Sequence, residues 1–226
     1  MKEMARLAVF NMFKTKDDLT GEAVRQRAII SILSSRENPI EKTRTGIAKL
    51  IAKEQKIAWK NIYSGIFGDL DKVLIPIGVV EEHGRLPLKR GPKALQEKGI
   101  PYYHLTRSGL LVALAVSRAG NQARLLERFF ADATLEEKPF VKSIMSLQGV
   151  TPSLIHSILE KYVRAFCDSK FDDLLPFDPT RLKNIHDESL MIQKEILQAF
   201  MTLSKRDRTE AIKFLDGITQ DERAKH

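Results

Sequence analysis

Cationic side chains are concentrated in residues 83–101, where their chemistry suits binding rather than catalysis. This segment contains one acidic residue, Glu97, with three glycines and three prolines. Its five cations are Arg85, Lys89, Arg90, Lys93 and Lys98. Cations on an extended loop can follow a phosphate backbone or enter a minor groove. The alternative is a loop that is charged only because it is exposed to water.

Motifs that support catalysis or hold a cofactor are absent from the sequence. We find no G-x-x-x-x-G-K-[ST] phosphate loop, no H-E-x-x-H, no paired C-x-x-C and no G-x-S-x-G. The histidines are scattered, and His186-Asp187-Glu188 fits the start of a helix better than a metal site. We therefore expect a protein that is not an enzyme and that uses no cofactor or metal.

The distribution of charge divides the chain. Residues 1–120 carry 21 Lys or Arg against 12 Asp or Glu, whereas residues 121–226 carry 16 against 17. A basic half beside a neutral half is typical of a polyanion-binding domain joined to a structural or regulatory one. A basic surface kept for solubility is the alternative. No apolar run approaches the roughly 20 residues that span a bilayer, so we expect no membrane association.

Apolar periodicity and turn residues predict a mainly α fold. An N-terminal helical arm is expected within residues 1–20, followed by helices over about 22–35, 41–54 and 58–74. Then come a short strand at 79–82, the loop at 83–101, a second strand at 102–105 and a helix over about 107–118 that Thr106 caps. From residue 121 onward, only helical patterns are found.

The order helix, helix, helix, strand, loop, strand, helix over residues 22–118 resembles the winged helix-turn-helix family of DNA-binding proteins. Four segments carry the resemblance: Ile47-Ala48-Lys49-Leu50-Ile51, Asn61-Ile62-Tyr63, Gly78-Val79-Val80-Glu81, and Tyr103-His104-Leu105-Thr106 followed by Gly109. The resemblance implies three helices plus a β-hairpin wing over 21–120. An all-helical region over 121–226 would then serve dimerisation or regulation. The sequence departs from the pattern in its long loop and in Gly65 and Gly68, which lie within the predicted recognition helix.

The resemblance also implies how the chain would meet double-stranded DNA. The recognition helix, about 58–72, would enter the major groove, and the wing, 83–101, would lie on the backbone or in the minor groove. The residues expected to face the groove are Trp59, Lys60, Asn61, Tyr63 and Ser64. Asn61 could bind an adenine edge, and Lys60 could meet guanine or a phosphate. Against this, Asn61 could simply be solvated and Trp59 could belong to the core.

Two functions from different classes follow. The first is a sequence-specific transcriptional regulator, cytoplasmic and nucleoid-associated, that forms a homodimer through its helical segments. The second is a winged-helix scaffold subunit of a transcription or replication assembly, with residues 121–226 contacting a protein partner. RNA binding ranks third, because the sequence lacks the aromatic sheet pattern that stacks single-stranded bases.

Overall fold

The computed structural model describes residues 6–87, 99–117, 121–167, 171–184 and 188–218. The chain divides into two compact units, Met1–Leu182 and Lys183–His226. The described part is mainly α-helical, as predicted, with one sheet of two antiparallel strands. Among these residues, no helix has both the length and the apolar composition that crossing a membrane requires.

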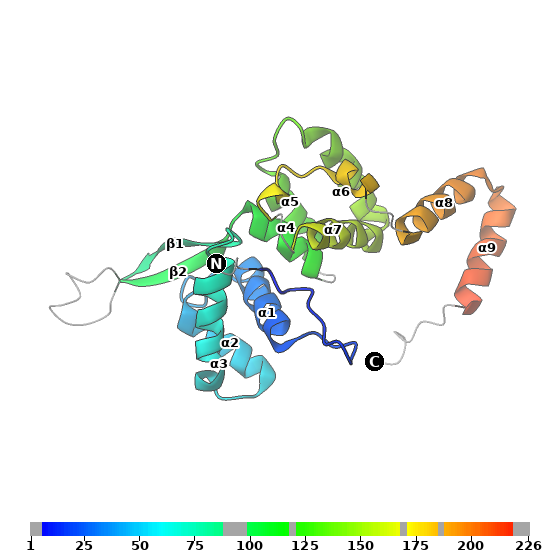
Figure 1. Ribbon diagram of the computed structural model, residues 1–226. Coiled ribbons are helices and arrows are strands. Elements are labelled where there is room, and N and C mark those ends of the chain that lie inside the picture. The colour runs from blue at the N-terminus through cyan, green and yellow to red at the C-terminus, as the bar shows by residue number, and fades with distance from the viewer. Residues whose placement is uncertain (1–5, 88–98, 118–120, 168–170, 185–187, 219–226) are drawn as a thin grey trace. The chain divides into compact units, whose positions relative to one another are not determined.

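The first unit opens with three helices and a hairpin (Figure 1). The helices are α1 (Gly21–Ser35), α2 (Arg44–Gln55) and α3 (Trp59–Asp69), and a turn of π-helix, Leu70–Leu74, continues α3. Strands β1 (Val80–Leu86) and β2 (Ile100–Leu105) follow. The unit continues with α4 (Arg107–Val116), α5 (Gln122–Phe130), α6 (Lys138–Val150) and α7 (Pro152–Phe166). The 3-10 turn Phe171–Leu174 follows, and a second, Pro179–Asn184, crosses the boundary between the units at Leu182.

Threonine caps set the starts of α1, α2 and α4. The side chains of Thr20, Thr43 and Thr106 each accept a hydrogen bond from the backbone N–H three residues further on. The predicted cap at Thr106 is therefore confirmed. Helix α2 begins at Arg44, three residues later than predicted, because residues 39–43 form a turn before the cap.

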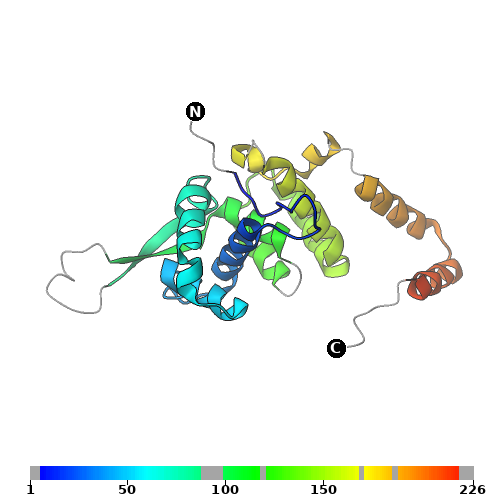
Figure 2. The ribbon, with the colours of Figure 1, turned by 60° about the horizontal axis from the view of Figure 1, so that its bottom comes forward.

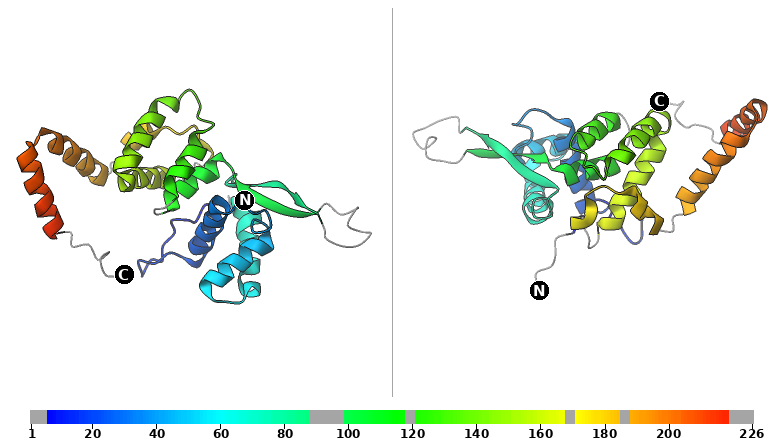
Figure 3. Two further views of the ribbon diagram at one scale, coloured as in Figure 1. Left: turned by 180° about the vertical axis from the view of Figure 1, so that it is seen from behind. Right: turned by 90° about the horizontal axis from the view of Figure 1, so that it is seen from above.

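The hairpin is longer than the sequence pattern indicated and projects away from the helices (Figure 3). Its register pairs Val80 with Leu105 and Glu81 with His104, and a bulge at His83 shifts the pairing beyond that point. A single bridge joins Tyr102 of β2 to Thr43, the residue that caps α2. The hairpin is thus linked to the start of α2, in addition to packing on α1 and α4.

Helix α4 lies at the centre of the first unit. Its residues 109–115 are all buried, and it packs on α1 and β2 as well as on α5 and α7. Its start comes very close to β1, since a Cβ added at Gly109 would lie 2.0 Å from the carbonyl oxygen of Val79. Only glycine allows that approach. The predicted boundary near residue 120 therefore does not separate two compact units, because one core extends across it to Leu182.

The predicted N-terminal helical arm is wrong for the residues described. Residues 6–20 contain no helix: Leu7 to Phe10 are buried in succession, and a bridge between Met12 and Leu19 closes a loop. Tertiary hydrogen bonds fix this extended course. The backbone N–H of Ala8 donates to Gln26 at 2.9 Å, and Arg27 donates to the carbonyl oxygen of Val9 at 2.6 Å. These bonds to α1 satisfy backbone groups that a helix would have paired locally.

The second unit contains two helices, α8 (Glu188–Thr202) and α9 (Lys205–Ile218), joined by a two-residue turn (Figure 2). Ser204 accepts a hydrogen bond from the Asp207 N–H and so caps the start of α9. None of the 15 residues of α8 is buried. This unit therefore lacks an enclosed apolar core of its own within the described residues.

Candidate nucleic-acid interface

The outward face of α3 carries three of the residues predicted to contact DNA. Lys60, Asn61 and Ser64 are all exposed. The opposite face holds Ile62 against the core and buries Ile66 completely. This division follows from the helical period, because positions three and four residues apart share a face. The structure therefore brings these three polar side chains together on the surface.

The two aromatic residues predicted for this face lie at its edge. Trp59 and Tyr63 are half-buried, pack against the core, and meet edge to face with ring centroids 5.6 Å apart. Phe67 follows one turn later, 6.4 Å from Tyr63, and is 43% exposed. The guanidinium of Arg44 lies over the Phe67 ring, 4.6 Å from its centroid. Neither Phe67 nor Arg44 was predicted, although Phe67 continues the four-residue spacing of Trp59 and Tyr63.

Both acidic residues at the C-terminal end of this segment form internal ion pairs. Asp69, whose side chain is only 5% exposed, pairs with Arg25 of α1 at 2.8 Å. Asp71 pairs with Arg44 of α2 at 2.5 Å. The negative charges of the segment are therefore neutralised by neighbouring helices. Its outward electrostatic character is set by the remaining cations.

Three lysines surround the turn between α2 and α3. Lys53 lies in the last turn of α2, Lys56 caps that helix with a left-handed φ of 55°, and Lys60 lies in the first turn of α3. All three are exposed, and within the described part of the chain none forms an ion pair. A cluster of unpaired ammonium groups at the start of an exposed helix is suited to contact with phosphate groups.

The two glycines of α3 do not break the helix, and they differ in their surroundings. A Cβ added at Gly65 would lie 2.9 Å from the Nε atom of Arg25, so glycine leaves room for that side chain to reach Asp69. A Cβ added at Gly68 would meet nothing within 4 Å. Gly65 therefore serves internal packing, whereas the backbone at Gly68 is open to close approach from outside.

On the hairpin, Arg85 is the predicted cation that the structure describes. It pairs with Glu82 at 2.6 Å across the bulge, and it is about 39% exposed. The other predicted wing residues, Lys89, Arg90, Lys93 and Lys98, lie outside the described residues. The structure thus places one of the five cations on β1, where its charge is partly offset by a neighbouring carboxylate.

The hairpin also carries a histidine pair that sequence reasoning missed. The rings of His83 and His104 stand 4.3 Å apart at nearly a right angle, and His104 Nε2 lies 2.8 Å from Glu81 Oε1. Burial and the neighbouring His83 lower the pKa of His104 below its ordinary value, although Glu81 acts in the opposite direction. His83 lies at the bulge, and no local sequence pattern reveals a bulge. No cluster here or elsewhere in the described ranges has three side chains placed to hold a metal ion.

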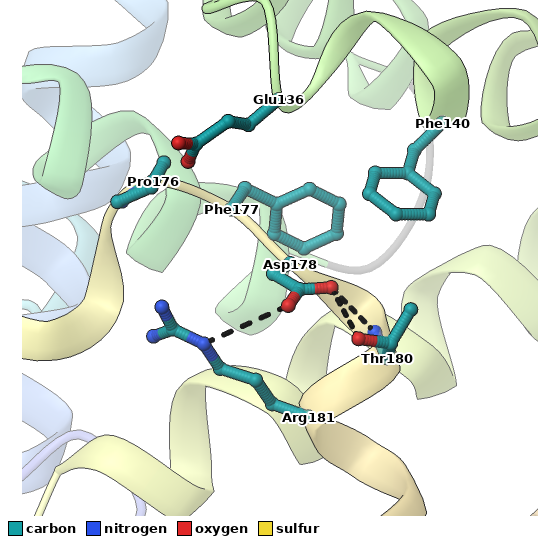
Figure 4. Close-up of a pocket in the computed structure, with 7 residues that line it drawn as sticks. All are labelled: Glu136, Phe140, Pro176, Phe177, Asp178, Thr180 and Arg181. Atoms are coloured by element: carbon teal, nitrogen blue, oxygen red, sulfur yellow. Dashed lines mark hydrogen bonds and ion pairs between the residues drawn. The ribbon is translucent and has the colours of Figure 1, made fainter.

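A pocket lies in the first unit, between the start of α6 and residues 176–181 (Figure 4). Phe140 and Phe177 form its apolar side. Three of its polar groups interact: Asp178 accepts hydrogen bonds from the N–H and hydroxyl of Thr180, and it lies 3.9 Å from Arg181. The exposed carboxylate of Glu136 also lines the pocket, so its wall is apolar on one side and polar on the other.

Comparison of the chain with protein-family models, curated proteins and solved structures finds no match. The α3 face is therefore identified by its own properties: exposed polar side chains, unpaired lysines and internally neutralised acids.

Proposed function

We propose that the protein is a DNA-binding transcriptional regulator of the winged helix-turn-helix type, with α3 as its recognition helix. The observation that carries this proposal is the contrast along α3. Lys60, Asn61 and Ser64 face outward, while Asp69 and Asp71 are paired with arginines of α1 and α2. A groove lined by phosphates would repel exposed, unpaired carboxylates. In α3 and the turn that follows it, the carboxylates of Asp69 and Asp71 are instead neutralised by arginines.

The arrangement of elements supports the same proposal. Three helices precede a two-stranded hairpin and then a further helix, which is the order of the winged helix-turn-helix family. The bridge between Thr43 and Tyr102 ties the hairpin to the start of α2, as expected if hairpin and helices act as one binding surface. An α-helix about 10–12 Å across fits the major groove, which is about 12 Å wide.

In the proposed complex, Lys60 and Asn61 of α3 have separate roles. Lys60 and the neighbouring Lys56 contact phosphates, which fixes the position of the protein on the duplex. Asn61 reads a base edge, because its amide can donate to and accept from adenine at once. Gly68 lets the helix backbone approach closely. The basic residues of the wing, 83–101, lie along the backbone or in the minor groove.

The experiment has two parts, because loss of a phosphate contact and loss of a base contact have different effects on DNA binding. Fluorescence anisotropy on mixed-sequence duplex, across 50–200 mM salt, measures the phosphate contacts. We expect Lys60→Ala to reduce the slope of log affinity against log salt by about 0.9 for each phosphate that the side chain neutralises. Lys142→Ala, an exposed lysine of α6, is the matched control and leaves the slope unchanged. If the native protein fails to bind duplex even at 50 mM salt, the proposal is wrong.

Sequence reading is tested by selecting bound duplexes from a random library with the native protein and with Asn61→Ala. The native protein enriches a motif, and Asn61→Ala loses preference at one position by about 1–3 kcal/mol while keeping its salt slope. Enrichment of the same motif by both proteins would remove Asn61 from the reading role.

A second candidate function, a scaffold subunit that binds protein through the winged helix, is favoured by apolar side chains beside the polar face. Ile57, two residues before α3, and Phe67, in its last turn, are each 43% exposed. A protein interface would bury both. Stoichiometry distinguishes the functions: a regulator purifies alone and binds duplex, whereas a scaffold purifies with other subunits and binds duplex weakly or without a motif.

A further inference from the structure

The second unit exposes an unusual amount of apolar surface. At least nine large apolar side chains of α8 and α9 are between 36% and 77% exposed, and Met201, at 77%, is the most exposed of them. No residue of α8 is buried. An isolated helix of about 15 residues is only marginally stable in water, so these two helices need a partner surface.

The pattern on α8 shows how broad that partner surface must be. Ile192, Ile196 and Phe200 form one stripe at four-residue spacing, and Leu197 and Met201 form a second stripe beside it. At 100° per residue, the two stripes span an arc of roughly 180°. A surface helix facing a single core needs an arc of about 100°, so α8 can contact two neighbours at once. This is the pattern of a helix inside a bundle.

Helix α9 supplies only part of that contact. The two helices diverge from the turn between them (Figure 2), and α9 has its own exposed apolar residues, including Phe214 at 66%. Near the turn, Arg208 donates to the carbonyl oxygen of Leu203 and stands over the ring of Phe200. Large apolar side chains of both helices are nevertheless exposed.

Charge identifies what can cover these faces. Residues 188–218 carry five Lys or Arg and five Asp or Glu, for a net charge of zero. Helix α8 carries one lysine against two glutamates, and α9 carries four cations against three acids, so the helices have opposite net charge. The α8–α9 pair of a second copy of this chain is also neutral, so the two pairs do not repel each other by net charge. The net charge of its α9 is opposite to that of α8 in the first copy. A strongly acidic or basic partner would have no such match.

The available area is sufficient for a stable pair. Without Met191, which lies outside the two stripes, eight exposed side chains at on the order of 100 Å² each give roughly 800 Å² per chain. A standard stable interface needs about 800 Å² from each partner. We infer that α8 and α9 form an intermolecular four-helix bundle with the same two helices of a second copy of this chain, and that this bundle makes the protein a homodimer.

This inference does not depend on DNA binding, and it differs from dimerisation through the whole of residues 121–226. Helices α5 and α7 use their apolar faces inside the first unit, where Leu126, Phe129, Leu159 and Tyr162 are all buried. We therefore assign dimerisation to residues 188–218.

The test measures the mass of the full-length chain by sedimentation equilibrium in the absence of nucleic acid. We expect twice the 25.7 kDa of one chain. The variant Ile196→Glu places a charge in the centre of the apolar arc and raises the dimer dissociation constant at least tenfold. Gln198→Glu, which adds the same charge on the polar side of the same exposed helix, is the matched control and changes the constant less than threefold.

A third variant, Ile196→Leu, keeps the apolar contact and retains the dimer. The thermal transition of the first unit, followed by the fluorescence of Trp59, stays the same in all variants, which separates loss of the interface from loss of the fold. A native chain that stays monomeric at 100 μM overturns the inference. So does a dimer that Ile196→Glu leaves intact, or one that Gln198→Glu weakens equally.

Discussion

The guanidinium of Arg25 lies across Gly65 and places its Nε atom 2.8 Å from Asp69 Oδ2, so that an ion pair between α1 and α3 passes over a glycine. A methyl group at residue 65 would occupy the space through which the arginine passes. The ion pair that joins the proposed recognition helix to α1 therefore depends on the absence of a side chain at residue 65.

We predict that the effect of Gly65→Ala on the free energy of unfolding changes sign when Arg25 is removed. In the native chain, Gly65→Ala displaces Arg25 and lowers the free energy of unfolding by about 1–2 kcal/mol. In an Arg25→Ala background, where the space is free, the same change raises it by up to about 1 kcal/mol through helix propensity. Urea denaturation of the four proteins of the cycle measures both values.

Gly68→Ala is the control for that cycle, because a Cβ at this position meets nothing within 4 Å. It stabilises both backgrounds by up to about 1 kcal/mol. Equal effects of Gly65→Ala in the two backgrounds would show that Arg25 does not pass over residue 65 in solution.

Glu137 predicts how the first unit responds to acid. It is fully buried at the start of α6, pairs with Arg107 of α4, and accepts hydrogen bonds from the N–H groups of Thr134 and Phe177. Burial alone would raise the pKa of Glu137, but these hydrogen bonds together hold it below its ordinary value of 4.5. Its contribution to stability is complete above pH 4.5 and is lost as the pH falls through the lower pKa of the folded state.

We therefore expect Glu137→Gln to destabilise the protein by about 3 kcal/mol at pH 7, since the change leaves Arg107 without its buried partner. The urea concentration at the midpoint of unfolding is measured at pH 7, 4.5 and 3. As the pH decreases, it should fall steeply for the native chain and less steeply for the variant. Parallel curves would show that another carboxyl group controls the acid response.

The histidine pair predicts a titration below the usual range. Because burial and His83 favour neutral His104, its pKa in the folded protein lies below 6.5. The stabilisation from neutral His104 is present above pH 6.5 and is lost as the pH falls toward the folded-state pKa. Nuclear magnetic resonance of the imidazole protons measures the pKa directly.

Two variants separate the causes of the shift. His83→Gln removes the neighbouring imidazole and raises the pKa of His104, whereas Glu81→Gln removes the carboxylate at 2.8 Å and lowers it further. If both variants leave the titration unchanged, burial alone accounts for the shift.

The helices could be predicted because their signals are local. Apolar spacing located α1 and α3, and Thr106 located the start of α4. The course of residues 6–20 could not be predicted, because Ala8 and Val9 are held by side chains of α1 almost 20 positions away. When those distant partners are unknown, a short apolar run with flanking cations fits a helix as well as it fits an extended segment.

The candidate site was predictable to a similar degree. Lys60, Asn61 and Ser64 are exposed because the period of α3 fixes its outward side, and that period is visible in the sequence. The aromatic edge and the His83–His104 contact depend on tertiary packing and on a bulge. The helices of the C-terminal half have similar apolar patterns in the sequence, yet Phe129 is buried and Phe200 is 36% exposed. The sequence pattern therefore does not distinguish a buried helix from an exposed one.

The central position of α4 has a consequence for how this chain can be divided or recombined. One side of the helix is covered by α1 and β2 and the other by α5 and α7, so a cut near residue 120 would leave the segment Leu110–Ala115 half uncovered. A fragment ending there would aggregate rather than fold. The elements before and after α4 therefore cannot be exchanged as independent modules, and any related protein that keeps one set must keep a matching surface for the other.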